Sequence, residues 1–210
     1  MIKPLPVARE GWPFIEVPAA IAAGLALTGR RALAVPFAAA SLACVGFFRD
    51  PERETPAVPG GVLAPADGRV VAVDELEDPF VGPAVRVAIF LSPLDVHVNR
   101  SPIAGLVVGV VYSRGRFVAA YRPDADDVNE RCVVHLQGES ARLTVVQIAG
   151  VVARRIVCRV GPGDKLAAGE RFGMIRFGSR TDCCMPHGTE VRVRVGDRVR
   201  GGVTVLGGLS

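Results

Sequence analysis

Glycine and proline interrupt this chain so often that most of it cannot form long helices. The 210 residues include 24 glycines and 16 prolines. Both residues weaken a helix interior, glycine through its backbone entropy and proline through its missing N–H group. After residue 50 they separate short runs rich in β-branched residues, a pattern typical of antiparallel strands. The sequence therefore predicts a mainly β protein.

Ten runs in this second region are predicted strands, at residues 61–63, 69–73, 84–90, 105–112, 131–136, 142–148, 154–160, 171–177, 190–195 and 204–206. The frame Gly-Asp-basic-aliphatic-x-x-Gly occurs at 163–169 and again at 196–202, and each copy predicts a turn. Together with the Pro-Ala-Asp-Gly turn at 65–68, this repeat resembles the β-sandwich of lipoyl and biotinyl domains. We therefore expect an antiparallel β-sandwich resembling a lipoyl/biotinyl-like barrel-sandwich hybrid.

The first 50 residues have a different character. Apolar runs at 17–28 and 32–48 are separated by a Gly-Arg-Arg turn, and each run contains a proline. Neither run reaches the roughly 20 residues that span a bilayer comfortably. These features predict an N-terminal apolar α-helical hairpin that lies in or on a membrane. The alternative is a helix pair buried in the core of a soluble protein.

Charge and cysteine content narrow the function classes. The chain carries 25 basic and 21 acidic residues, a net charge of +4 that does not indicate a nucleic-acid surface. Its five cysteines include no C-x-x-C pair, which argues against a disulfide framework and a zinc ribbon. The three histidines are few for a metal centre. We expect a reducing, cytosol-facing compartment, no metal and no nucleic-acid partner.

The Gly178-Ser179 pair, at the end of a predicted strand, permits a specific reaction. A serine hydroxyl can attack the carbonyl of the preceding residue to form an ester, and glycine leaves that carbonyl uncrowded. Elimination from the ester gives dehydroalanine, which hydrolyses to ammonia and an N-terminal pyruvoyl group. A pyruvoyl group is a built-in ketone that forms a Schiff base with an amine and accepts electrons. A simple turn is the alternative interpretation of this pair.

Two further segments carry candidate acid–base groups. His97 lies in a proline-bounded loop, bracketed by Asp95 and Asn99, where we expect it to be accessible to solvent or ligand. This setting favours a role in proton transfer. Asp67 lies in the Pro-Ala-Asp-Gly turn, and its carboxylate is a candidate for orienting the histidine and stabilising its charged form. A purely structural turn is the alternative for Asp67.

Taken in order, these motifs resemble the phosphatidylserine decarboxylase proenzymes over nearly the whole chain, most closely their short, archaeal-type form. The resemblance rests on the apolar N-terminus, Phe-Phe-Arg-Asp-Pro-Glu-Arg at 47–53, the Pro-Ala-Asp-Gly turn, Asp-Val-His-Val-Asn-Arg at 95–100, Asn-Glu-Arg at 129–131 and Phe-Gly-Ser at 177–179. Each motif is weak alone, but their order and spacing make the similarity specific.

The resemblance implies a pyruvoyl-dependent carboxy-lyase that converts phosphatidylserine to phosphatidylethanolamine and CO2 through a Schiff base. Catalytic roles are implied for Ser179, His97 and Asp67, with Ser179 as the precursor of the pyruvoyl cofactor. Self-cleavage between Gly178 and Ser179 would give two chains that remain together as an α/β heterodimer. Further oligomerisation is left open.

The resemblance also implies a division of labour along the chain. Residues 1–50 are expected to associate with the lipid surface of the cell membrane, peripherally or monotopically. Residues 51–210 are expected to form the catalytic domain on the cytoplasmic side, and cleavage would divide the protein into 1–178 and 179–210.

The chain departs from the family pattern at Arg100, where longer members have a second loop histidine. In those members the two histidines divide maturation and decarboxylation between them. Here either His97 serves both steps, or Arg100 or another group replaces one of them. Two other functions remain open. One is a membrane-anchored, non-enzymatic adaptor or carrier with a lipoyl-like sandwich, and the other is a pyruvoyl decarboxylase of a soluble amino acid.

Overall fold

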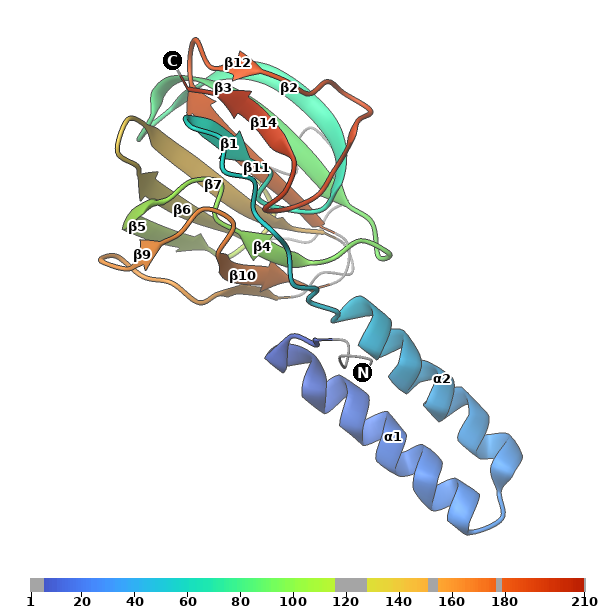
Figure 1. Cartoon of the computed structure of the whole chain (residues 1–210). Helices are drawn as coiled ribbons and strands as arrows, with labels where there is room; N and C mark the ends of the chain where they lie inside the picture. Colours follow the sequence, from blue (N-terminus) through green and yellow to red (C-terminus); the bar gives the residue numbers. More distant parts are fainter. Residues whose placement is uncertain (1–5, 116–127, 151–154, 177–178, 210) are drawn as a thin grey trace. The chain divides into compact units, whose positions relative to one another are not determined.

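The computed structural model describes residues 6–115, 128–150, 155–176 and 179–209. The chain divides into two compact units, Met1–Glu52 and Arg53–Ser210 (Figure 1). The described part of the first unit is helical, and that of the second is built mainly of strands.

The helical unit contains a short 3-10 helix, η1 (Arg9–Gly11), and two longer helices, α1 (Trp12–Leu27) and α2 (Arg31–Phe47). The two longer helices pack side by side as a hairpin, which confirms the predicted helix pair (Figure 1). The Ser41 hydroxyl of α2 donates a hydrogen bond of 2.9 Å to the Ile15 carbonyl of α1. Within the described ranges, no helix has the length and apolar character required to cross a bilayer.

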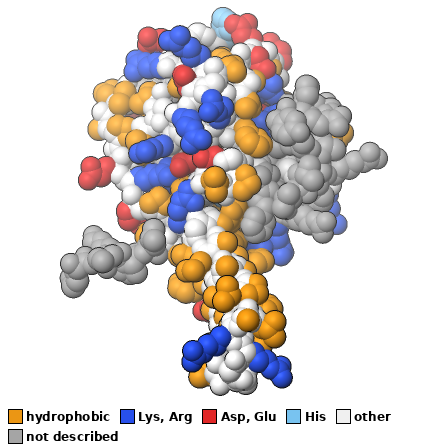
Figure 2. Space-filling model, turned by 90° about the vertical axis from the view of Figure 1, so that its right-hand side faces the viewer, with side chains coloured by type: hydrophobic (Ala, Val, Ile, Leu, Met, Phe, Trp, Pro, Cys, Tyr) orange, Lys and Arg blue, Asp and Glu red, His pale blue; other side chains and the backbone are white. Residues whose placement is uncertain are grey.

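Large apolar side chains are exposed on both helices of the hairpin. They are Trp12, Phe14, Val17, Ile21, Leu27, Leu33, Val35, Phe37 and Leu42. Leu27, beside the turn between the helices, is 89% exposed. Figure 2 shows hydrophobic side chains over the surface of the helices and basic side chains at the end where the helices are joined. The hairpin thus lacks the continuous polar outer face of a helix pair that is stable in water.

The strands of the second unit form three sheets. One sheet has the order β1-β14-β12, from Gly61–Leu63, Val205–Gly208 and Glu190–Val191. Another has the order β4-β10-β8, from Val98–Arg100, Arg171–Ile175 and Ile156–Cys158. The largest has the order β13-β2-β3-β11-β7-β6-β5-β9, from Arg198–Val199, Gly68–Asp78, Gly82–Leu91, Ser179–Pro186, Arg142–Ala149, Arg131–Gln137, Gly105–Ser113 and Lys165–Leu166.

One hydrophobic core joins the three sheets. Val62 of β1, Ile89 of β3, Leu143 of β7, Phe172 of β10 and Leu206 of β14 all belong to the same buried cluster. Every strand pairing in the described part of the unit is antiparallel. The predicted antiparallel, mainly β fold is therefore confirmed.

The two copies of the Gly-Asp repeat form the same turn. Gly163 and Gly196 have φ values of 98° and 100°, a left-handed backbone that favours glycine. Asp164 and Asp197 each accept a hydrogen bond from the backbone N–H three residues earlier, at 2.8 and 3.0 Å. Each turn leads into a two-residue strand, β9 or β13. A shared sequence frame thus produces a shared local structure.

The main difference from the predicted strands is β11, which lies between β3 and β7 in the largest sheet. Its sequence, Ser-Arg-Thr-Asp-Cys-Cys-Met-Pro, contains two charged residues and lacks the β-branched alternation used to identify strands. The short strands β4, β9 and β13 are also absent from the predicted set, because two or three residues carry no periodic pattern.

Candidate active site

Ser179 is the first residue of β11, and two strands hold it from either side. Its register partners are Leu91 at the end of β3 and Ala149 at the end of β7. The Ser179 side chain is 0% exposed, and its Oγ has no hydrogen-bond partner among the described residues. A buried hydroxyl without a partner costs free energy, so it points to chemistry at this position. Gly178, the residue before the expected cleavage, lies outside the described residues.

The segment that carries His97 contacts β11 at both of its ends, through strand pairing before the loop and through a hydrogen bond after it. β3 ends at Leu91, opposite Ser179, and the chain then continues into the His97 loop. Two residues beyond His97, the Asn99 side-chain amide donates a hydrogen bond of 3.0 Å to Thr181 Oγ1. Thr181 shares a face of β11 with Ser179, since alternate residues of a strand point to the same side. The loop is therefore held at the Ser179 end of β11.

His97 is buried, which corrects the expectation of a solvent-accessible loop histidine. The side chain is 0% exposed, because the next residue, Val98, begins β4 and pairs with Met174 of β10. Its Nδ1 lies 2.9 Å from the backbone carbonyl oxygen of Asp95. A carbonyl can only accept, so Nδ1 carries the proton, and Nε2 is the proton-accepting atom of neutral His97.

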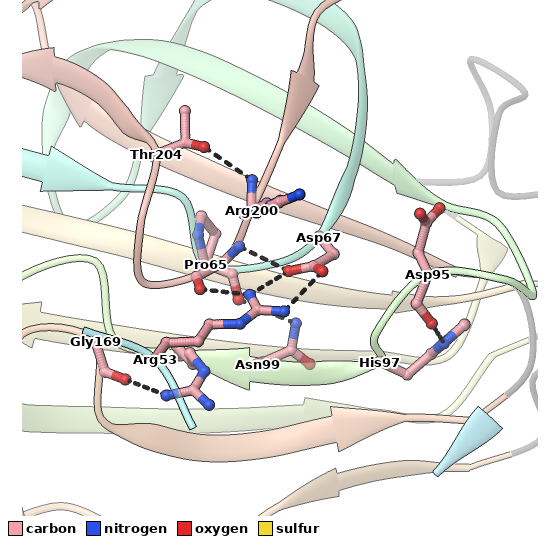
Figure 3. A network of polar contacts seen from close by, with 11 residues as sticks. Arg53, Pro65, Asp67, Asp95, His97, Asn99, Gly169, Arg200 and Thr204 are labelled. Atoms are coloured by element: carbon pink, nitrogen blue, oxygen red, sulfur yellow. Dashed lines mark hydrogen bonds and ion pairs between the residues drawn. The ribbon is translucent and has the colours of Figure 1, made fainter. Parts of the chain in front are cut away.

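The carboxylate of Asp67 is held by Arg53 and by the backbone (Figure 3). Arg53 Nη2 donates to Asp67 Oδ2 at 2.8 Å, and the Gly201 N–H donates to Oδ1 at 2.8 Å. These donors take the place of the expected direct contact with His97, which is absent from the described residues. Asp67 and Asp95 nevertheless line one cavity, so the Asp67 carboxylate lies beside the His97 loop. The sequence motif contains Arg53 but does not reveal this ion pair.

A buried chain of hydrogen bonds joins β7, β4 and β11. Gln147 Nε2 donates to Asn99 Oδ1 at 2.8 Å, and Asn99 donates in turn to Thr181. The adjacent N–H of Arg100 donates to the Pro65 carbonyl at 2.9 Å, which holds the turn that contains Asp67. β4 therefore brings the three segments of the site together. Gln147 and Thr181 were not predicted, and the only sequence signal was the position of Thr181 two residues after Ser179.

The opposite face of β11 carries ion pairs. Arg180 binds Asp182 through two hydrogen bonds of 2.8 Å each. Arg86 of β3 lies 3.6 Å from Asp182 and binds Asp74 of β2 at 2.7 Å. Burial raises the pKa of the Asp182 carboxyl, and the charge of Arg180 opposes that rise. Paired charges thus allow a polar segment to occupy the middle of the sheet.

The cysteines of the β unit have free thiols. Burial raises the pKa of the Cys183 thiol to about 12, so it is protonated and unreactive at neutral pH. Within the part of the chain that the structure describes, no group of three or more His, Cys, Asp or Glu side chains could hold a metal ion.

Known proteins resemble this chain over nearly its full length. The family described as phosphatidylserine decarboxylase matches residues 41–207. A phosphatidylserine decarboxylase proenzyme of Nitrosomonas europaea is 46% identical over 202 residues, covering 95% of this chain and 94% of that protein. Proteins of the same description from Symbiobacterium thermophilum and Burkholderia ambifaria are 49% and 44% identical. They cover 100% and 97% of this chain, and 98% and 96% of their own lengths.

The β unit, its buried serine and these relatives define an enzyme of the decarboxylase class that is made as a proenzyme. The chain belongs to the phosphatidylserine decarboxylase family, as its motifs predict. Membership of an enzyme family favours catalysis over the alternative of a non-enzymatic adaptor or carrier.

Proposed function

We propose that the chain cleaves itself between Gly178 and Ser179 and then converts phosphatidylserine to phosphatidylethanolamine and CO2. The observation that carries this proposal is the buried Ser179 Oγ, which has no hydrogen-bond partner among the described residues. In the cleavage, Oγ bonds to the carbonyl carbon of Gly178 as the C–N bond breaks, which leaves an ester. Elimination of the glycine carboxylate gives dehydroalanine, and water then releases ammonia and leaves a pyruvoyl group on the new N-terminus.

The pyruvoyl group supplies an electrophilic carbonyl for the substrate amine and an electron sink for the loss of CO2. The residues of this chain supply the environment of the pyruvoyl group. Strand pairing with Leu91 and Ala149 fixes the backbone of Ser179 on both sides. The burial of this position excludes water, and a less polar environment favours a reaction in which a carboxylate loses its charge.

His97 is the proposed proton carrier. Its Nε2 would accept the proton of the Ser179 hydroxyl during maturation or deliver a proton to the former α carbon during decarboxylation. Asp67 is proposed to act with His97 from the neighbouring turn. Its ion pair with Arg53 fixes that turn, against which the backbone of Arg100 is hydrogen bonded. Asp67 is thus a positioning residue for the loop.

We also propose that the hairpin attaches the enzyme to the cytoplasmic side of the cell membrane, where phosphatidylserine is available. The exposed apolar side chains of α1 and α2 support attachment by burial in lipid. A pyruvoyl decarboxylase of a soluble amino acid would gain nothing from such a hairpin. The two proposed chains, 1–178 and 179–210, would remain together because β11 lies between β3 and β7.

Intact-mass analysis of purified protein tests the cleavage. Wild type should give two chains divided at Gly178–Ser179, and the smaller chain should resist Edman degradation because a pyruvoyl group has no free amine. Ser179→Ala should give one uncleaved chain without decarboxylase activity. Ser101→Ala is the matched control, since Ser101 is also fully buried and donates to the Ile103 carbonyl at 2.7 Å; it should still cleave. Division of the Ser179→Ala protein at this bond would refute the mechanism.

Release of CO2 from phosphatidylserine, compared with release from free serine, tests the substrate class. We expect activity on the phospholipid alone. Equal activity on free serine would favour the soluble-substrate alternative.

A further inference from the structure

A cavity of about 380 Å³ adjoins the His97 loop. It is lined by Asp67, Gly68, Asp95, Arg198, Val199 and Arg200. Figure 3 shows Arg200 close to Asp67, with Asp95 beside His97. The cavity therefore combines the turn of Asp67, the loop of His97 and the strand β13, and nothing in the proposed chemistry uses its two arginines.

Among the described residues, the carboxylates of this cavity have hydrogen-bond partners, whereas the guanidinium groups of Arg198 and Arg200 have no ion-pair partner. Asp67 binds Arg53, and Asp95 accepts hydrogen bonds of 2.8 and 2.7 Å from the backbone N–H and the hydroxyl of Ser92. Neither Arg198 nor Arg200 has an acidic partner in the described part of the chain. The cavity is thus equipped to receive a negatively charged group.

A third arginine strengthens this charge. In the pairing of β13 with β2, Arg198 lies directly opposite Arg69. In the described part of the chain, Arg69 Nη1 donates to a neutral acceptor, the Gly196 carbonyl, at 2.9 Å, and has no acidic partner. Like charges directly opposite each other destabilise a sheet. An anion bound between or beside these side chains would remove that cost, so the register itself points to an anionic ligand.

We propose that Arg198 and Arg200 bind the phosphodiester group of the phospholipid substrate in this cavity. The inference rests on the proposed function, since it uses the location of the cavity beside His97. Guanidinium groups match phosphate oxygens in both charge and geometry. The serine carboxylate is the less suitable ligand, because an ion pair with arginine would stabilise the charge that decarboxylation must remove.

The proposal predicts a particular kinetic signature. The phosphodiester is the same in substrate and product, so contacts to it stabilise the ground state and the transition state alike and act mainly on KM. The Arg198→Gln/Arg200→Gln double variant should raise KM for phosphatidylserine about tenfold or more in nonionic detergent micelles, with a much smaller change in kcat. Its self-cleavage should be complete, which also shows that it folds.

The matched control is the Arg192→Gln/Arg194→Gln double variant. Both residues are exposed arginines of the same C-terminal segment, both lie outside the cavity lining, and the change in net charge is the same. This control should keep the wild-type KM. A wild-type KM in the cavity variant would overturn the proposal, and so would an equal rise in both variants, which would indicate general attraction to the lipid surface.

Inorganic phosphate separates a phospholipid site from a site for free phosphate. We expect it to compete with phosphatidylserine in wild type and to compete more weakly in the cavity variant. Phosphate binding that is lost in the cavity variant while KM for phosphatidylserine stays unchanged would assign the site to free phosphate and overturn the proposal. Absence of CO2 release by wild-type protein would instead refute the proposed function. In that case, calorimetric titration of wild type and the cavity variant with inorganic phosphate would still test the anion site.

Discussion

In the helical hairpin large apolar side chains lie on the outside, whereas in the β unit charged and amide side chains lie on the inside. The hairpin exposes Leu27 and Leu42, and the β unit buries Asn99, Gln147 and Asp182. Exposed apolar surface costs about 25 cal/mol per Å² in water, and a buried polar group costs free energy unless it is hydrogen bonded. The two units therefore depart in opposite ways from a simple soluble protein, in which apolar side chains are buried and polar side chains are exposed.

The two departures differ in how they are compensated. Asn99 and Asp182 find partners within the β unit itself. Ser179 Oγ and Gln147 Oε1 have no partner in the described ranges. The apolar exterior of the hairpin is not covered by any of residues 6–52, the part of its unit that the structure describes. A buried polar group with a hydrogen-bond partner in the same unit has a structural role. A buried group without such a partner indicates a ligand or a reaction, and an uncovered apolar surface indicates contact with lipid.

The largest effect should come from placing charge on the hairpin exterior. In the Leu27→Asp/Val35→Asp/Leu42→Asp variant, three exposed side chains that would enter lipid become charged, so vesicle binding should fall at least about 10⁴-fold. Sedimentation with phospholipid vesicles measures the bound fraction. Arg30→Gln/Arg31→Gln is the control for electrostatic attraction and should retain most binding, even at high salt. Unchanged binding of the triple aspartate variant would show that the exposed apolar surface does not contact lipid.

The next largest effect concerns the buried histidine. His97→Ala should slow maturation or decarboxylation by about 10²–10⁴-fold, the usual contribution of a general acid–base group. An uncleaved variant would assign His97 to maturation, whereas a cleaved and inactive variant would assign it to decarboxylation. His135→Ala and His187→Ala are the controls and should be close to neutral. Normal cleavage with near-normal turnover in His97→Ala would remove His97 from the mechanism.

A smaller effect is expected from the hydroxyl that holds Asn99. Thr181→Val keeps the shape of the side chain but cannot accept the hydrogen bond, so self-cleavage should slow about three- to tenfold. A time course of proenzyme loss on denaturing gels measures this rate. Thr144→Val is the matched control, because Thr144 is also buried and its hydroxyl donates to Asp78 at 2.9 Å, away from Ser179. Equal slowing in the two variants would show only a general loss of stability.

The smallest effect is a pH dependence of stability. His135 packs against Phe80 with ring centroids 4.7 Å apart, and burial lowers its pKa below the usual value of 6.5. The unfolded chain therefore binds this proton more readily, and stability is lost as the pH falls below about 6.5. His135→Gln should reduce the fall in Tm between about pH 7.5 and about pH 5.5 by about 1–3 °C. An unchanged fall would show that His135 does not contribute.

Local patterns in the sequence were sufficient to predict the two helices of the hairpin and most of the longer strands of the β unit. The apolar runs became helices, and each β-branched run contains a strand, although the predicted strands at 154–160 and 190–195 shorten to Ile156–Cys158 and Glu190–Val191. β11 could not be predicted in this way, because its strand conformation depends on neutralisation of Asp182 by Arg180 and by Arg86 from a different strand. That pairing is a property of the sheet, which no local window of sequence contains.

The residues of the candidate site also fall into two groups, those that short motifs reveal and those that only tertiary contacts reveal. Ser179 and His97 could be selected as candidates because the proposed chemistry is expressed in short motifs. Gln147 reaches the site only through the register that places it opposite Thr181, and Arg53 only through its contact with Asp67. The accessibility of His97 was predicted incorrectly, since the three residues that follow it form a strand too short to detect.

The location of β11 in the middle of the sheet affects how the protein can fold before and after the proposed cut. The proposed cut before Ser179 would leave β11, β13 and β14 on the small fragment, where each pairs with a strand of the large one. Before the cut, folding is a reaction within one chain and is independent of protein concentration. After it, refolding requires two separate chains to meet, so the equilibrium depends on concentration. If the proposed cut occurs, the uncut precursor is the form suited to folding, and the lifetime of the cut enzyme is set by how rarely it unfolds.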